Sequence, residues 1–148
     1  MSENLTAFMQ YANAFEEGFA ADDWQRVDVL FGDDVAWSVG GLPAADLFLA
    51  QGRANVAATI KRSVDAFDRR FDGRAPLPTK PPVEIPGGVH LEWTVTYTRE
   101  GLPPFVLRGE EWDLFRDGKL VMHHEQIHNG PEAFQYLARH HDALLPAR

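Results

Sequence analysis

Apolar residues recur at the helical spacing of three and four positions in several stretches of the chain. The pattern predicts helices over about residues 4–18, 22–31, 53–70 and 131–145. The first helix has the most aromatic stripe, since Phe8, Phe15 and Phe19 lie on it. A helix with one apolar face packs that face against another layer, so these helices predict a second layer.

The second layer is predicted from segments in which apolar and polar residues alternate, as in half-buried strands. These segments span residues 35–39, 83–85, 89–98, 105–116 and 119–128. Residues 72–88 hold five of the ten prolines and are expected to be extended, and residues 44–50 are expected to form one or two helical turns. Helices segregated from an antiparallel meander predict an α+β fold, with residues 1–148 forming a single domain.

The dipeptide Asp117-Gly118 predicts a two-residue hairpin turn and thereby a register for the last two strands. In that register each opposed pair has numbers that sum to 235. Glu110 then lies opposite Glu125, Trp112 opposite His123, and Arg108 on the same face.

That face carries candidate acid/base chemistry. Two sheltered carboxyl groups side by side give one acid and one base, and an imidazole titrates near neutral pH. Glu125, Glu110 and His123 are therefore the candidate catalytic residues, while Arg108 could restrain the two carboxylates and Trp112 could stack on a substrate. Two alternatives remain open: the carboxylates point into water, or a one-residue bulge exchanges the two faces.

Four further aromatic residues could line a cavity between the sheet and the first helix: Trp37, Trp93, Tyr11 and Phe15. Plain core packing is an equally good interpretation of these four side chains. If they line a cavity, they are candidate substrate-binding residues.

Composition narrows the classes of function. The chain has 148 residues and no cysteine, which excludes disulfide scaffolds, thiolate metal sites and a cysteine nucleophile. A net charge of −8 disfavours nucleic-acid binding. The longest apolar runs are too short to cross a membrane, and the acidic first 20 residues are unlike a targeting peptide, so we expect a cytoplasmic location. Phosphate-loop and metal-binding motifs are missing, so we expect no cofactor and no metal.

The segment from Asp23-Trp24 to Val35-Ala36-Trp37 resembles the start of nuclear transport factor 2 (NTF2)-like proteins. Gly52-Arg53-Ala54-Asn55-Val56 resembles the entry to their third helix, and Asp117-Gly118-Lys119-Leu120 their last hairpin. The resemblance implies a strongly curved, mixed or antiparallel sheet that wraps over N-terminal helices into a cone with an apolar pocket, and it implies a homodimer. This superfamily includes ketosteroid isomerases, SnoaL-like polyketide cyclases, limonene epoxide hydrolases and proteins that only bind.

The resemblance to ketosteroid isomerases is uneven. Their catalytic aspartate on the first strand would fall on Ser38-Val39-Gly40, which has no carboxylate, and their helix-one tyrosine would fall on Phe15. Their second acid would fall near Glu111. Polyketide cyclases and epoxide hydrolases place an acidic residue where this chain has Glu125.

The sequence thus predicts a pocket for a small hydrophobic molecule. The favoured function is a SnoaL-like enzyme of cyclase, isomerase or hydrolase type that uses carboxylate and histidine acid/base chemistry. One alternative is a non-catalytic module that binds a small hydrophobic ligand, and another is an assembly role through the outer face of the sheet.

Overall fold

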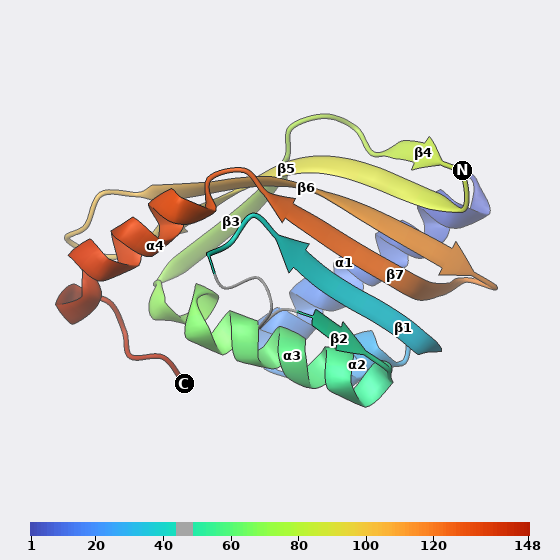
Figure 1. Ribbon diagram of the computed structural model, residues 1–148, viewed down its shortest axis with the longest axis horizontal. Helices are drawn as coiled ribbons and strands as arrows, with labels where there is room; N and C mark the ends of the chain where they lie inside the picture. Colours follow the sequence, from blue (N-terminus) through green and yellow to red (C-terminus); the bar gives the residue numbers. More distant parts are fainter. Residues whose placement is uncertain (44–48) are drawn as a thin grey trace.

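The computed structural model describes residues 1–43 and 49–148 of the chain. Figure 1 shows a strongly twisted sheet with helices lying across one face, and we call that face the inner face. The helices are α1 (Glu3–Ala21), α2 (Gln25–Asp28), α3 (Arg53–Ala66) and α4 (Gly130–Arg139), with 3-10 turns η2 (Asp68–Arg70) and η3 (His141–Ala143). The strands are β1 (Phe31–Gly40), β2 (Leu49–Gln51), β3 (Gly73–Pro78), β4 (Val83–Ile85), β5 (Gly88–Thr98), β6 (Phe105–Arg116) and β7 (Lys119–Ile127).

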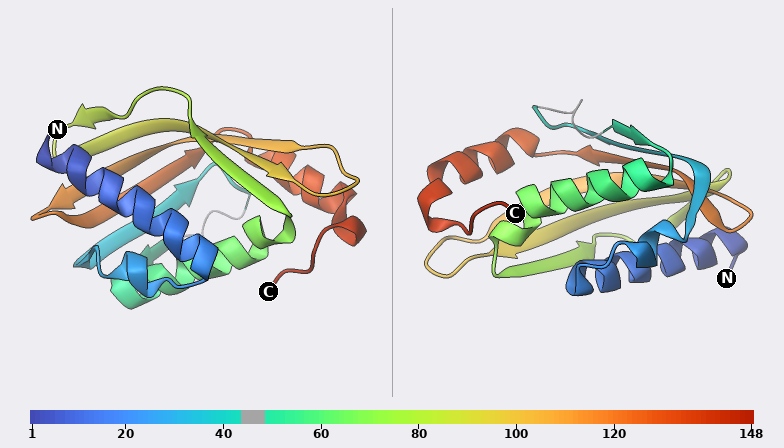
Figure 2. Two further views of the ribbon diagram at one scale, coloured as in Figure 1. Left: turned by 180° about the vertical axis from the view of Figure 1, so that it is seen from behind. Right: turned by 90° about the horizontal axis from the view of Figure 1, so that it is seen from below.

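The sheet is mixed and open. Its strand order is β2-β1-β7-β6-β5-β3, with β4 also paired to β5. The pair β1–β7 is parallel, and the other pairs are antiparallel. Figure 2 shows α1 crossing the inner face, where it contacts β5, β6 and β7, while α3 packs on β1 and β2. This arrangement confirms the predicted α+β class.

The first helix extends further than predicted. Gly18, expected to end the helix, lies within it. A Cβ at Gly18 would come within 3.1 Å of Val27 Cγ2, so the missing side chain lets α2 pack directly on α1. The helix ends at Asp22, whose backbone is left-handed (φ 53°).

The proline-rich connection contains a strand that the sequence did not predict. β3 includes Pro76 and Pro78, and it forms the edge of the sheet beside β5. In a central strand each backbone N–H donates to one of the two neighbouring strands, and a proline has no N–H. Such a strand is therefore tolerated at an edge, where alternate N–H groups have no neighbouring strand to bind. The helical turns expected over residues 44–50 are wrong for Leu49-Ala50, which belong to β2, and the other residues of that segment lie outside the described residues.

The β6–β7 hairpin has the predicted turn but a different register. Asp117 and Gly118 both have positive φ (53° and 72°), as a type I′ turn requires. The two pairs next to the turn match the prediction, but the next pair joins Leu114 to Met122. Val121 is therefore an extra residue on β7, which is a β-bulge.

The bulge exchanges the faces predicted for the residues beyond it. Glu125 lies opposite Glu111, not Glu110, and His123 lies opposite Asp113. The inner face therefore receives Glu111 and Asp113 from β6, and Glu110 lies on the outer face. Among the described residues, no helix is long and apolar enough to cross a membrane.

Candidate active site

A cavity of about 540 Å³ lies between the inner face of the sheet and the helices. Its walls are mostly apolar and aromatic, and they come from α1, α3, α4 and the strands β1, β3, β5, β6 and β7. The aromatic lining residues are Phe8, Tyr11, Phe15, Trp37, Phe67, Trp93, Tyr97 and Phe134. A cavity of this size and lining suits a small organic molecule.

One polar group of the cavity is built around His123. This residue is only 2% exposed, and its Nδ1 lies 2.6 Å from Oδ1 of Asp113, which is fully buried on the neighbouring strand. Its Nε2 lies 3.3 Å from Oε1 of Glu125. The ring is further fixed by Trp37, which stacks on it at 5.9 Å between centroids, and by Tyr11, which meets it edge-on. His123 is thus held between two carboxylates in one orientation.

The local charges determine the protonation state of His123. Burial alone would lower its pKa, but the charge and hydrogen bond of Asp113, together with Glu125, outweigh burial and raise the pKa well above its usual value. The imidazole is therefore a cation at neutral pH. The carboxyl groups of Asp113 and Glu125, one on each side of the ring, stabilise that cation.

Glu111 is the neutral member of the group. Burial raises its pKa well above the usual range, and the negative charges of Asp113 and Glu125 raise it further, against an opposing effect of His123. A carboxyl group kept protonated in this way is a hydrogen-bond donor at neutral pH. The cavity therefore offers a neutral carboxyl on β6 directly opposite a second carboxyl, Glu125, on β7.

Tyr11 places a phenol beside the same group. Burial raises its pKa well above the usual value, and the charges of Asp113, Glu111 and Glu125 add to this effect. The hydroxyl therefore stays protonated and can donate a hydrogen bond into the cavity that its ring lines.

Six of the residues selected from the sequence line this cavity: Glu125, His123, Trp37, Trp93, Tyr11 and Phe15. The other three lie on the opposite face of the sheet because of the bulge at Val121. Glu110 accepts hydrogen bonds there from His90 (2.9 Å) and His128 (3.1 Å), so its predicted position opposite Glu125 is wrong.

Trp112 and Arg108 share that outer face. Trp112 stacks between His90 and His124, with centroids 5.0 Å and 5.7 Å from its ring. Arg108 is exposed, and its backbone N–H donates to Asn129. Neither residue lines the cavity between the sheet and the helices, in which the sequence predicted that they would contact a substrate.

Sequence reasoning missed Asp113 and assigned Glu111 to the wrong face. The evidence for the true faces lies on β7, where Leu120 and Ile127 are both buried although they are seven positions apart. Two residues at odd spacing cannot share a face of a regular strand. A bulge between them accounts for the burial of both, but the sequence alone also allowed Val121 to share the face of Ile127 in a regular strand.

The same cluster contains donor atoms of the kind that bind metals. One donor atom each of Glu111, Asp113 and His123 lie within 4.8 Å of one another. Both nitrogens of His123 already face carboxylate oxygens, so a metal ion would have to displace one of these contacts. The acid/base arrangement needs no such displacement.

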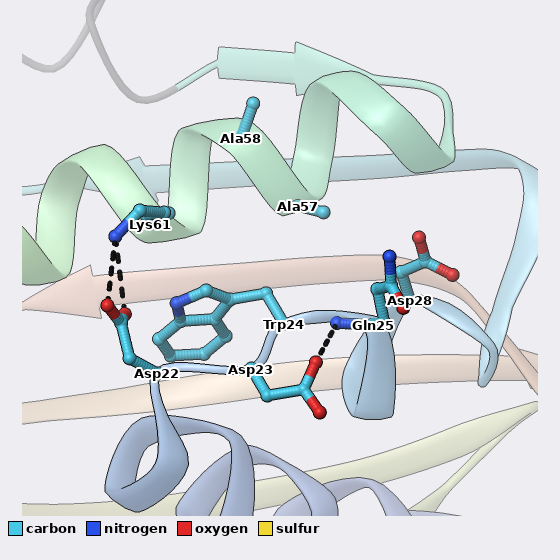
Figure 3. Close-up of a pocket in the computed structure, with 8 residues that line it drawn as sticks. All are labelled: Asp22, Asp23, Trp24, Gln25, Asp28, Ala57, Ala58 and Lys61. Atoms are coloured by element: carbon cyan, nitrogen blue, oxygen red, sulfur yellow. Dashed lines mark hydrogen bonds and ion pairs between the residues drawn. The ribbon is translucent and has the colours of Figure 1, made fainter.

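A second depression, of about 510 Å³, opens on the surface between α2 and α3 (Figure 3). Its charged side chains are paired, and Nε1 of Trp24 is buried without a hydrogen-bond partner among the described residues. Lys61 binds Asp22 at 3.2 Å beside the indole of Trp24, and Asp23 accepts a hydrogen bond from the backbone of Gln25 at the start of α2. These contacts join α1, α2 and α3, which gives the depression a structural role.

Comparison with known proteins gives matches by structure only. No protein-family model and no curated protein matches the sequence. TerC, co-crystallised with polyporic acid, is 20% identical over 93% of this chain and 99% of its own, with a TM-score of 0.65. An NTF2-like protein from Burkholderia pseudomallei is 18% identical over 93% of this chain and 97% of its own, with a TM-score of 0.65.

A third similar structure is an LEH-like epoxide hydrolase from M. tuberculosis. It is 18% identical over 90% of this chain and 91% of its own, with a TM-score of 0.61. Identities this low establish the architecture and not the chemistry. The chain therefore has the NTF2-like fold, as its sequence resemblance implied.

Proposed function

We propose that the protein is a cofactor-independent enzyme that performs acid/base chemistry on a small hydrophobic molecule. The observation that carries this proposal is the pairing of Glu111 and Glu125 on adjacent strands, beside an imidazole whose two nitrogens face Asp113 and Glu125. A neutral carboxyl and a charged carboxylate in one apolar cavity supply an acid and a base together.

The roles follow from the protonation states. Glu125 accepts a proton from a carbon next to a carbonyl, or from a water molecule that adds to the substrate. Glu111 donates a hydrogen bond to the oxygen that gains negative charge, and Tyr11 can assist it. His123, fixed by Asp113, orients Glu125 and stabilises its charge before the proton moves. Isomerisation, ring closure and hydration all need this same acid and base.

The solved structures lend support at the level of the fold. TerC was crystallised with the organic molecule polyporic acid, and another neighbour is an LEH-like epoxide hydrolase. A co-crystallised organic molecule in one protein of this fold and an epoxide hydrolase in another support the proposal that the apolar cavity takes a small organic molecule.

Replacing Glu125 by glutamine tests the proposal. The change keeps the shape of the side chain and removes the base, so turnover should fall by about 100-fold or more on any carbonyl or epoxide substrate found by screening. Glu84→Gln, on the exposed strand β4, is the matched control and should retain full activity. Unchanged turnover in Glu125→Gln, with the fold intact by circular dichroism, would remove Glu125 from the chemistry.

A non-catalytic binding role is the second candidate, and one observation favours it. β1 contributes Trp37 and Val39 to the cavity but no carboxylate, so that wall offers only apolar contacts. If tryptophan fluorescence responds to hydrophobic ligands while mass spectrometry detects no product from any of them, binding alone is the better description.

A further inference from the structure

The cavity has a second polar group at a distance from His123. Four residues from different elements form it: Glu16 of α1, Asp68 of η2, Arg74 of β3 and Tyr97 of β5. Arg74 binds Asp68 through Nε at 3.0 Å and Glu16 through Nη1 at 2.7 Å, and Tyr97 donates to Asp68 at 2.7 Å. These contacts fix all four side chains at the cavity wall.

The guanidinium of Arg74 is already paired within this group. Its guanidinium has a carboxylate on two sides and lies over the rings of Phe15 and Phe19, at 5.7 Å and 4.7 Å from their centroids. A guanidinium neutralised and stacked in this way has little capacity left for an anionic ligand.

Asp68, by contrast, keeps an unused acceptor. Both of its hydrogen bonds from other side chains end on Oδ1, and Oδ2 has no side-chain donor among the residues that the structure describes. The side chain is mostly buried and lines the cavity, so a molecule in the cavity can donate a hydrogen bond to Oδ2. A hydroxyl group is an uncharged donor of suitable size.

The charges of the lining select against anions. The carboxylates of Glu16, Asp68 and Glu125 outnumber the cations Arg74 and His123. The buried Asp113 behind His123 adds another negative charge. An anionic ligand would enter a site with surplus negative charge and low dielectric, which is unfavourable.

The two polar groups lie far apart along the sheet. Tyr97 is opposite Phe105 on β6, six residues before Glu111, which corresponds to roughly 20 Å of strand. Side chains that point inward shorten the span across the cavity. A molecule that contacts both groups must therefore be elongated.

We infer that the ligand is an uncharged, elongated, largely apolar molecule with a hydroxyl group at the end away from the reacting carbon, and that Asp68 Oδ2 accepts a hydrogen bond from this hydroxyl. This inference rests on the proposed function for the identity of the reacting end. It makes Asp68 a specificity-determining residue.

The test uses three probes that differ at one substituent: 4-hydroxybiphenyl, 4-methoxybiphenyl and biphenyl-4-carboxylate. Equilibrium dialysis at pH 7 measures their dissociation constants with the full chain. The hydroxyl probe should bind about tenfold more tightly than the methoxy probe, as expected for a hydrogen bond to a charged acceptor. The carboxylate probe should bind most weakly.

Two asparagine variants assign the preference to a residue. In Asp68→Asn the tenfold preference should disappear while the methoxy probe binds as before. Asp72→Asn, at an exposed residue that pairs with Arg99 outside the cavity lining, should keep the preference. Equal binding of the hydroxyl and methoxy probes, tightest binding of the carboxylate, or a preference that survives Asp68→Asn would each overturn the inference.

A crystal structure of the wild type with 4-hydroxybiphenyl decides the question if Asp68→Asn does not fold. The probe oxygen within hydrogen-bond distance of Asp68 supports the inference, and the same oxygen bound to Glu111 or Glu125 contradicts it. Dialysis requires no turnover, so Glu125→Gln should retain the preference. Failure of the proposed catalysis is thereby distinguishable from failure of this inference.

Discussion

Replacing Asp113 by asparagine should destabilise the protein in a manner that depends on pH. Asp113 is fully buried and hydrogen-bonded to His123, so the change removes one charge of a buried pair and leaves the other. Loss of one partner in such a pair costs about 3 kcal/mol or more. Because the folded-state pKa of His123 is raised, this cost must vary with pH.

The sign follows from linkage. The raised pKa of His123 contributes stability that is fully present below the unfolded-state value near 6.5. This contribution falls by about 1.4 kcal/mol for each pH unit above that value, until the folded-state pKa is reached. Glu111 adds to this pH dependence, because the charge of Asp113 also raises the pKa of Glu111. Asp113→Asn removes a repulsion that exists only when Glu111 is ionised, so it costs less stability at high pH than at low pH. The destabilisation should therefore be more than ~1 kcal/mol larger at pH 5.5 than at pH 8.

Urea denaturation followed by tryptophan fluorescence at the two pH values measures this difference. Asp33→Asn is the matched control, because the side chain of Asp33 is 99% exposed, and it should change the free energy of unfolding by less than about 0.5 kcal/mol. Equal destabilisation of Asp113→Asn at both pH values would refute the assignment of His123 as a buried cation.

Two further predictions concern the cavity. Gly109→Ala should lower the melting temperature by several degrees and weaken ligand binding, because a Cβ there would lie 2.7 Å from Cζ2 of Trp93 and 2.8 Å from a backbone oxygen. Thermal unfolding and dialysis measure the two effects. An unchanged melting temperature would contradict the close approach. Turnover should decline on the alkaline side, because the raised pKa of Glu111 means that its donor proton is lost as pH rises. Glu111→Gln keeps a neutral donor and should flatten that decline in the pH–rate profile. An unaltered profile would exclude Glu111 as the acid.

The sequence predicted most elements because their signals are local. The aromatic stripe that includes Phe8 and Phe15 predicted α1, and the Asp117-Gly118 turn predicted the hairpin. β3 was not predicted because it contains Pro76 and Pro78, and prolines are not tolerated in a central strand. Its position at the edge of the sheet is known only from the tertiary structure. The resemblance to NTF2-like proteins supplied the fold, which pattern alone left at the level of α+β.

The candidate site was predictable only in part. Glu125 and His123, predicted as candidate catalytic residues, both line the cavity. Their partners on β6 differ from the predicted ones, because the register beyond the turn depends on one bulged residue, Val121. Local sequence carries little information on a bulge, which forms where packing requires it. Here Leu120 pairs with Phe31 and Val121 packs over Gly32, so contacts with β1 fix the irregularity. The homodimer stays a prediction.

The bulge at Val121 also has a consequence for alignments. A related chain without the extra residue would carry its histidine and glutamate one position closer to the hairpin turn, yet would pair them with the same two acids on β6. Alignments that fix spacing from the turn would then place chemically equivalent residues in different columns. The Asp113–His123 pair is the better reference point, with a gap allowed at Val121.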